Sequence, residues 1–448
     1  MFMTSVQNHL PRLNGSSRIL ILLLALAWSG CALFKPTTDK SPTVTDTSTE
    51  EKSEEVKVDT IEWEIVSEEA APPIINRGPN TKSTFKDVYQ VALLAPFSSD
   101  QVQYESAQLS GRTNRLIQFY LGLRYGLERL VTSIPITLRV VDTEKVGRTP
   151  QVLSELPEVR DADLIIGPYF NEELIPVADY AKTTGKVIIS PWNSGEVVVD
   201  NPFFVQVRPS LETHCKFLTR EIRKRYDSHE IMLIGKSSDR SSLHYCQQEY
   251  RRLENGNTLD SLAEFVIEDV SDPTLADTLR AKIEAGTKAF LIPKWSDEPY
   301  VITILSKLNF AKADSNVTVF GLPQWATFYR MDFDYYENLN VHISSARPLR
   351  MNSEKAKTFR KAYFSRYGAY PTDEAYFGME LMQLVSYLLQ QNGTLIYEGF
   401  SDLGTQDFAH DFEFVQIFGE DGESIKYYLN QHLNLYRFIN YRFEKVDF

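Results

Sequence analysis

Short apolar runs of strand length alternate with helical segments along most of this chain, and this alternation constrains the fold more than any other feature. The first run is VYQVALLAP at 88–96, and comparable runs occupy 134–141, 163–167 and 186–190. Between the first two runs, apolar residues from Leu116 onward recur at helical spacing. Strands that are apolar on both faces and separated by helices are typical of a parallel sheet covered on both sides.

The same alternation starts again later in the chain. Four more strand-like runs follow, at 230–235, 263–267, 288–292 and 317–320. Two helices are then expected at 353–367 and 372–389, and the strand-like stretches 412–418 and 435–443 are expected to form one closing hairpin. The sequence therefore predicts an α/β protein with two successive units of about four strands each.

The composition excludes several other classes of protein. Of the 448 residues, 43% are apolar and 24% are charged. These values are typical of globular proteins and exclude a polytopic membrane protein, a collagen-like chain or a wholly disordered one. The net charge of −13 argues against a nucleic-acid partner, because binding phosphates requires clustered cations. Three cysteines are too few for a disulfide-rich scaffold.

The amino-terminal residues predict an export signal rather than a folded element. Two arginines precede the ten-residue apolar run ILILLLALAW at 19–28, which is too short to cross a hydrocarbon core of about 30 Å. A serine–glycine pair then precedes Cys31, and this pattern resembles the lipobox of bacterial lipoproteins, although Trp28 replaces the usual aliphatic residue. The resemblance implies that 1–30 is a lipoprotein signal peptide and that Cys31 is acylated. The alternative is an ordinary signal peptide in which the cysteine is incidental.

Residues 31–86 are rich in Thr, Ser, Pro, Glu and Lys, so they cannot bury enough apolar surface to fold. We expect a disordered acidic tether there. The short apolar insert at 61–66 alternates like a strand and either docks onto another surface or stays disordered.

Six short stretches carry a resemblance to a known family. They are VALLAP at 91–96, FYLGLRYG at 119–126, ADLIIGP at 162–168, VIISP at 187–191, NPFFVQVRPS at 201–210 and YPTDEAYFG at 370–378. In this order they resemble the type I periplasmic binding proteins, the branched-chain amino acid receptor group of ABC importers. The resemblance implies two Rossmann-like lobes with parallel sheets, joined by hinge strands and closing around a ligand. Lobe 1 would comprise 87–208 and 345–395, and lobe 2 would comprise 209–344 and 396–448.

Ligands of open α/β sheets bind beyond the carboxyl ends of the strands, so the loops after the strands are the candidate site. The expected ligand-binding residues are Ser98, Tyr169, Phe170, Ser190, Trp192, Asn193 and Ser194 in lobe 1, and Lys236, Arg240, Trp295 and Trp325 in lobe 2. The family resemblance implies that the loops after Gly167 and Ser190 hold a ligand carboxylate through backbone N–H groups at helix N-termini.

Two features of these loops leave alternatives open. Tyr169, Phe170 and Trp192 replace the small residues of the amino acid receptors, and the rings either stack on sugar, peptide or muropeptide groups or fill the space and leave no pocket. Lys236 and Arg240 either contact an acidic ligand or are solvated loop cations.

No constellation of catalytic or metal-binding residues is evident. GKS at 235–237 lacks the upstream glycine of a phosphate-binding loop, because Glu230 stands at that position. There is no GxGxxG or GxSxG motif, and the histidines lack metal-ligand spacing, so we expect no cofactor, no metal and no enzyme activity.

Cys215 and Cys246, on consecutive predicted helices, are either a disulfide or buried free thiols.

These observations favour a lipid-anchored binding protein of a bacterial envelope, of the ABC-importer substrate-binding type. It would face the periplasm and capture an amino acid, a peptide or a cell-wall fragment between its lobes. Its partners would be membrane lipid, through acylated Cys31, and a small ligand or envelope protein. Ala32 lacks the Asp that retains some lipoproteins at the inner membrane, which favours the outer membrane. The alternative is a non-transport interaction module with a filled cleft that regulates peptidoglycan synthesis or envelope assembly. It would resemble the activator lipoproteins of peptidoglycan synthases.

Overall fold

The computed structural model describes residues 82–101, 109–129, 134–145, 147–198, 200–254, 261–348, 353–403 and 411–446. The expected signal peptide, Cys31 and the tether up to residue 81 lie outside them. In this described part of the chain, no helix combines the length and the apolar character that a membrane crossing requires. Residues 82–86, expected to be tether, contact the folded body instead. The Thr84 N–H donates to Thr394 Oγ1 at 3.1 Å, and Lys86 Nζ lies 2.5 Å from Asp163 Oδ1.

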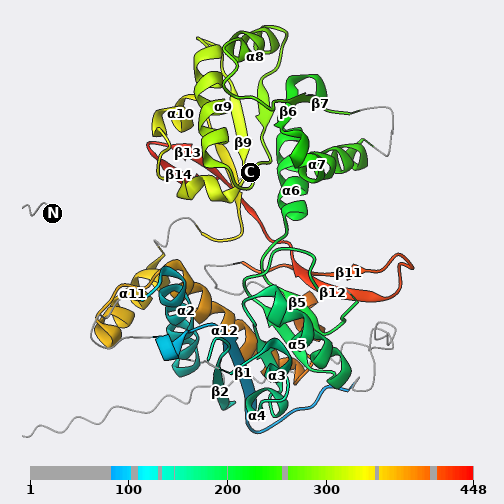
Figure 1. The fold of residues 1–448 in the computed structure, drawn as a ribbon, viewed down its shortest axis with the longest axis vertical. Coiled ribbons are helices and arrows are strands. Elements are labelled where there is room, and N and C mark those ends of the chain that lie inside the picture. The colour runs from blue at the N-terminus through cyan, green and yellow to red at the C-terminus, as the bar shows by residue number, and fades with distance from the viewer. Residues whose placement is uncertain are drawn as a thin grey trace, which may run out of the picture. The chain divides into compact units, whose positions relative to one another are not determined.

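The first lobe is built on a seven-stranded sheet with the spatial order β11-β12-β5-β4-β3-β1-β2 (Figure 1). Its strands are β1 (Tyr89–Ala95), β2 (Ile136–Asp142), β3 (Leu164–Ile166), β4 (Val187–Ser190), β5 (Phe204–Gln206), β11 (Phe414–Phe418) and β12 (Ile425–Asn430). All neighbouring strands run parallel except β11 and β12. Every residue of β3, β4 and β5 is buried, as expected for strands covered on both faces.

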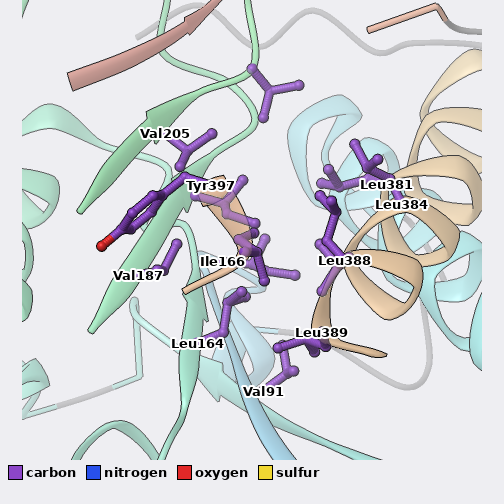
Figure 2. Close-up of a cluster of buried hydrophobic side chains, with 14 of the residues drawn as sticks. Val91, Leu164, Ile166, Val187, Val205, Leu381, Leu384, Leu388, Leu389 and Tyr397 are labelled. Carbon is purple, nitrogen blue, oxygen red and sulfur yellow. The ribbon is translucent and has the colours of Figure 1, made fainter. Parts of the chain in front are cut away.

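Helices cover both faces of this sheet. One face packs against α2 (Gly111–Glu128), α12 (Asp373–Asn392) and the 3-10 helix η5 (Ile396–Asp402), and the other packs against α3 (Pro150–Leu153), α4 (Pro157–Arg160) and α5 (Asn171–Thr184). The remaining helix, α11 (Glu354–Tyr367), packs on α2 and α12. Figure 2 shows Leu384 and Leu388 of α12 facing Val91, Leu164 and Val187 from three different strands.

The helices α2 and α12 approach closely because glycines lie where they meet. A Cβ atom added at Gly122 would lie 2.1 Å from the carbonyl oxygen of Ala375, and one added at Gly378 would lie 2.2 Å from that of Phe119. Real Cβ atoms do not approach backbone oxygens this closely, so any side chain at either position would push the helices apart.

The second lobe contains another seven-stranded sheet, with the order β14-β13-β10-β9-β8-β6-β7. Its strands are β6 (Ile231–Gly235), β7 (Ala263–Val266), β8 (Ala289–Leu291), β9 (Thr318–Gly321), β10 (His342–Ser345), β13 (Asn434–Ile439) and β14 (Arg442–Lys445). The strands β6 to β10 pair in parallel, whereas β13 pairs antiparallel with both β10 and β14.

Helices also cover both faces of the second sheet. One face packs against α8 (Leu275–Glu284), α9 (Glu298–Ala311) and α10 (Phe333–Asn338), and the other packs against α6 (Leu211–Arg223) and α7 (Arg240–Leu253). Among the described residues, short 3-10 helices also occupy connections: η1 (Ser99–Gln101) in the first lobe, and η2 (Ser228–Glu230), η3 (Ser237–Asp239) and η4 (Pro323–Thr327) in the second. The predicted pair of α/β lobes with parallel strands is thus confirmed, with antiparallel strands added at one edge of each sheet.

The carboxyl-terminal segment closes the fold differently from the prediction. The stretches 412–418 and 435–443 were expected to pair with each other, but β11 pairs with β12 in the first sheet and β13 pairs with β14 in the second. Residues 396–403 and 411–430, expected in lobe 2, therefore belong to the first lobe. The physical reason is aromatic packing: the rings of Tyr397 and Tyr428 stack at 4.9 Å in the core of that lobe.

Candidate functional site

A cavity of about 320 Å³ opens in the first lobe beyond the carboxyl ends of β3, β4 and β5. Its lining residues are Arg112, Arg115, Leu116, Tyr169, Asn171, Trp192, Asn193, Ser194, Gly195, Arg208 and Glu374. The loops after three neighbouring strands meet there, because parallel strands end at the same edge of a sheet.

Three helices begin at this cavity, and each contributes a first-turn residue to its lining: Arg112 from α2, Asn171 from α5 and Glu374 from α12. The hydroxyl of Ser110 accepts a hydrogen bond from the Thr113 N–H at 3.0 Å and so caps α2. In α5 and α12, the N–H groups of the first turn donate no hydrogen bond to the side chain of the N-cap residue. Backbone N–H groups at a helix N-terminus carry partial positive charge, so the three helix ends together favour an anion.

Carboxylates hold two arginines, Arg112 in the cavity lining and Arg347 beside it. Arg112 Nη2 lies 2.7 Å and 2.8 Å from the two oxygens of Glu144, and its guanidinium lies over the Phe170 ring at 5.1 Å. Arg347 Nη1 donates to Glu374 Oε1 at 2.9 Å. These ion pairs fix the side chains at the cavity wall and neutralise their charge.

The other two arginines lack such partners. Among the residues that the structure describes, no carboxylate oxygen lies within 4 Å of Arg115 or Arg208. Arg208 Nη1 lies 3.4 Å from the carbonyl oxygen of Trp192. Its side chain keeps contact with solvent, but the surrounding protein lowers the pKa of Arg208, chiefly by removing water and then through repulsion from Arg347. A guanidinium group remains a cation in proteins, so both arginines make the cavity electropositive.

Aromatic rings form one wall of the cavity. The Trp192 ring packs at 5.0 Å on Phe119, which belongs to the core, and the Tyr169 ring packs at 5.4 Å on Trp192. Gly167 precedes Tyr169 by two residues and has φ +92°, and an added Cβ would lie 2.3 Å from the Leu94 carbonyl oxygen. Only glycine fits there, so the β3 loop leaves the sheet along one fixed path. The rings fill part of the space and leave the 320 Å³ cavity open.

The other predicted residues of the first lobe support this wall. Asn193 holds two loops together: its Nδ2 donates to Asn171 Oδ1 at 2.7 Å, and its Oδ1 accepts from the Gly195 N–H at 3.0 Å. Ser98 hydrogen-bonds Glu144, the partner of Arg112. Ser190 is fully buried, and its hydroxyl has no partner among the described residues. Ser98, Phe170 and Ser190 do not line the cavity.

The structure does not gather the predicted residues of the second lobe into one site. Lys236 Nζ is paired with Asp297 at 2.8 Å, and Arg240 lines a separate hollow of about 680 Å³ beside α7 and β7. Trp295 packs on His214 at a ring distance of 5.4 Å. Trp325 is 1% exposed in the core, where its Nε1 donates to a backbone oxygen, and this burial leaves no surface for a ligand. We therefore leave Trp325 out of the candidate site.

The sequence matches no protein-family model and no curated protein. Solved structures with a similar fold include an ABC transporter substrate-binding protein from Desulfitobacterium hafniense in complex with Leu. It is 17% identical, with a TM-score of 0.52, over 80% of this chain and 100% of that one. A putative branched-chain amino acid ABC transporter from Rhodospirillum rubrum is 14% identical, with a TM-score of 0.58, over 80% of this chain and 100% of its own.

Full-length LpoA from Haemophilus influenzae is 10% identical, with a TM-score of 0.53. The match covers 81% of this chain but only 60% of LpoA. The chain has the type I periplasmic binding protein fold. The resemblance that the six sequence stretches indicated is thus confirmed at the level of the fold.

Seven lining residues were not among the expected ligand-binding residues: the four charged residues Arg112, Arg115, Arg208 and Glu374, together with Leu116, Asn171 and Gly195. The helical spacing of apolar residues in the sequence starts at Leu116, yet α2 begins at Gly111 and places Arg112 and Arg115 three positions apart on one helical face. Arg208 and Glu374 lie within stretches that carried the resemblance to the type I periplasmic binding proteins, so the available signal was a charged residue within an otherwise matching motif.

The two cysteines of the second lobe are free thiols, which settles the alternative left open by the sequence. Both are fully buried, on the adjacent helices α6 and α7. Burial and a hydrogen bond to Cys246 raise the pKa of the Cys215 thiol. Within the described ranges, no group of His, Cys, Asp and Glu side chains would hold a metal ion.

Proposed function

We propose that this protein is a lipid-anchored, non-catalytic binding protein of a bacterial envelope, facing the periplasm, that captures a small ligand in its first lobe. The observation that carries the proposal is the cavity beyond β3, β4 and β5, where three loops and three helix N-termini meet. Its volume of about 320 Å³ falls within the range of small-molecule pockets, and a few polar groups converge on an aromatic wall.

The aromatic wall gives the first test. Tyr169 lines the cavity and rests on Trp192, so Tyr169→Ala removes ligand-contacting surface without entering the core. Calorimetric titration of the full chain in detergent with amino acids, short peptides, peptidoglycan fragments and small organic anions is expected to detect a ligand, and Tyr169→Ala is expected to weaken its binding.

The matched control is Tyr329→Ala, which removes an exposed tyrosine from the second lobe. It is expected to bind as the parent does. Ligand capture in this cavity would be contradicted if the parent protein bound none of the compounds in the panel. It would also be contradicted if the two substitutions weakened ligand binding equally.

The second candidate function is a non-transport interaction module that regulates peptidoglycan synthesis or envelope assembly. The observation that favours it is the packing of Tyr169 and Trp192 on each other, which restricts the cavity to the lower end of the usual pocket volumes. This candidate predicts no ligand in calorimetry and a measurable affinity for a purified peptidoglycan synthase in biolayer interferometry.

The proposed anchor is the acylated side chain of Cys31, after cleavage of residues 1–30, in the outer membrane. The supporting evidence is the sequence pattern at 19–31, which lies outside the described residues. Cys31→Ala is expected to release the protein from the membrane fraction and to remove the mass of the acyl chains. Unchanged mass and membrane binding in this variant would contradict acylation.

A further inference from the structure

The charges around the first-lobe cavity do not balance. Its lining contains three guanidinium groups, those of Arg112, Arg115 and Arg208, and one carboxylate, that of Glu374. The Glu374 carboxylate is already bonded to Arg347, and Arg112 is bonded to Glu144. Two guanidinium groups, Arg115 and Arg208, are left without a carboxylate partner in the described part of the chain.

These positive charges repel one another. Arg208 is close enough to Arg115 and Arg347 for both to destabilise its charged form, and Glu374 only partly compensates. Like charges held together cost free energy unless an anion lies between them. The partial positive charges of three helix N-termini add to the same field. A ligand with a single negative charge would leave part of this field uncompensated.

The cavity gives an ammonium little compensation for the charges of its arginines. Glu374 supplies the only lining carboxylate; Oε1 accepts a hydrogen bond from Arg347, and Oε2 is buried, with almost no surface open to a ligand. A free amino acid carries an ammonium beside its carboxylate, and that ammonium would lie among guanidinium groups here. The arginines therefore disfavour the zwitterion.

We propose that this cavity selects a small ligand with two negative charges and no ammonium, such as a phosphate monoester or a short dicarboxylate. The inference rests on the proposed function, since it names the chemical class of the ligand that the same cavity captures. Planar guanidinium groups suit both oxyanions because they donate pairs of parallel hydrogen bonds. Tyr169 and Trp192 would pack against the apolar part of the ligand.

The test is calorimetric titration of the full chain in detergent with four probes: inorganic phosphate, phenyl phosphate, succinate and leucine. The dianions are expected to bind, with phenyl phosphate tighter than inorganic phosphate because its ring reaches the aromatic wall, and leucine is expected not to bind. Arg115→Gln and Arg208→Gln are each expected to weaken dianion binding about tenfold or more, as loss of a charged hydrogen bond does.

Two further variants separate charge from folding. Arg208→Lys keeps the charge and is expected to retain more affinity than Arg208→Gln. Arg280→Gln removes an arginine of α8 that is paired with Asp277 and is expected to bind as the parent does. Melting temperatures by circular dichroism identify any variant that fails to fold.

The outcomes distinguish this inference from the proposed function. Binding of leucine in preference to every dianion would overturn the inference and leave ligand capture standing. Dianion binding that is unchanged in both Arg115→Gln and Arg208→Gln would also overturn it, because the anion would then lie elsewhere. If none of the four probes bound, and none of the amino acids, peptides, peptidoglycan fragments and organic anions of the first titration bound either, both proposals would be overturned.

Discussion

Acidification is expected to destabilise the second lobe, because two of its buried histidines are held neutral. His214 is 3% exposed and His342 is 1% exposed. Arg225 Nη1 lies 3.1 Å from His342 Nε2, and since arginine only donates, Nε2 must accept; Nδ1 then carries the proton and donates to the Asn340 carbonyl oxygen at 2.8 Å. A second proton would place two cations face to face.

The magnitude follows from the pKa values. Burial lowers the pKa of His214 to about 3, with a further contribution from Arg208, and burial lowers the pKa of His342 to about 4. The unfolded chain takes up these protons near pH 6.5, so the unfolded state gains protons first and stability falls as pH falls below that value. Between about pH 6.5 and about pH 5, each histidine costs about 2 kcal/mol, or about 4 kcal/mol for both, at about 1.36 kcal/mol per unit.

The assay is urea unfolding at about pH 7.5 and about pH 5, followed by tryptophan fluorescence. A background in which Trp28, Trp63 and Trp192 are replaced by Phe leaves Trp295 and Trp325 to report on the second lobe. This choice matters because burial raises the pKa of Glu173 in the first lobe, and the contribution of that carboxyl to stability grows on acidification, opposite in sign to the effect of the histidines.

His214→Asn and His342→Asn are each expected to reduce the pH-dependent difference in unfolding free energy by about 2 kcal/mol, whatever their effect at neutral pH. His244→Asn, at an exposed position of α7, is the control. If both buried variants kept the full difference of the parent protein, the reasoning from burial would be refuted.

Three further predictions concern packing and the thiols. Gly122→Ala is expected to lower the free energy of unfolding by about 1–3 kcal/mol through the clash with α12, whereas Gly111→Ala, which meets nothing within 4 Å, is expected to be neutral; equal melting temperatures would contradict this. Leu388→Ala is expected to cost about 2–5 kcal/mol in urea unfolding, because its side chain is 1% exposed, and a loss below about 0.5 kcal/mol would be inconsistent with that burial. Cys215 and Cys246 are expected to resist alkylation in the folded protein and both to react after unfolding without reductant; labelling that requires reductant would show a disulfide instead.

Local patterns in the sequence were enough to predict the elements of the fold. The apolar runs at 163–167 and 186–190 became β3 and β4, because a strand covered on both faces must be apolar at every position. The rule that ligands bind beyond the carboxyl ends of parallel strands then selected Tyr169, Trp192, Asn193 and Ser194, all of which line the cavity.

Such local patterns could not predict which strands pair with each other when they lie far apart in the sequence. Nothing local marks β11 as a partner of β12 rather than of 435–443, because strand patterns fix which face a residue occupies and not which strand lies beside it. The same limit applies to Trp325. Like Trp192, it follows a buried strand, but Gly321 leaves room for its ring in the core.

By itself, the sequence determined the type of each main element, the two-lobed class of fold and the loops where a site would form, because these depend on the spacing of apolar residues along one segment. Only the tertiary structure decided which charges share a cavity. Arg115 comes from a helix, Arg208 from a loop after β5 and Glu374 from a late helix, and their electrostatic effect depends on distances that no local pattern encodes.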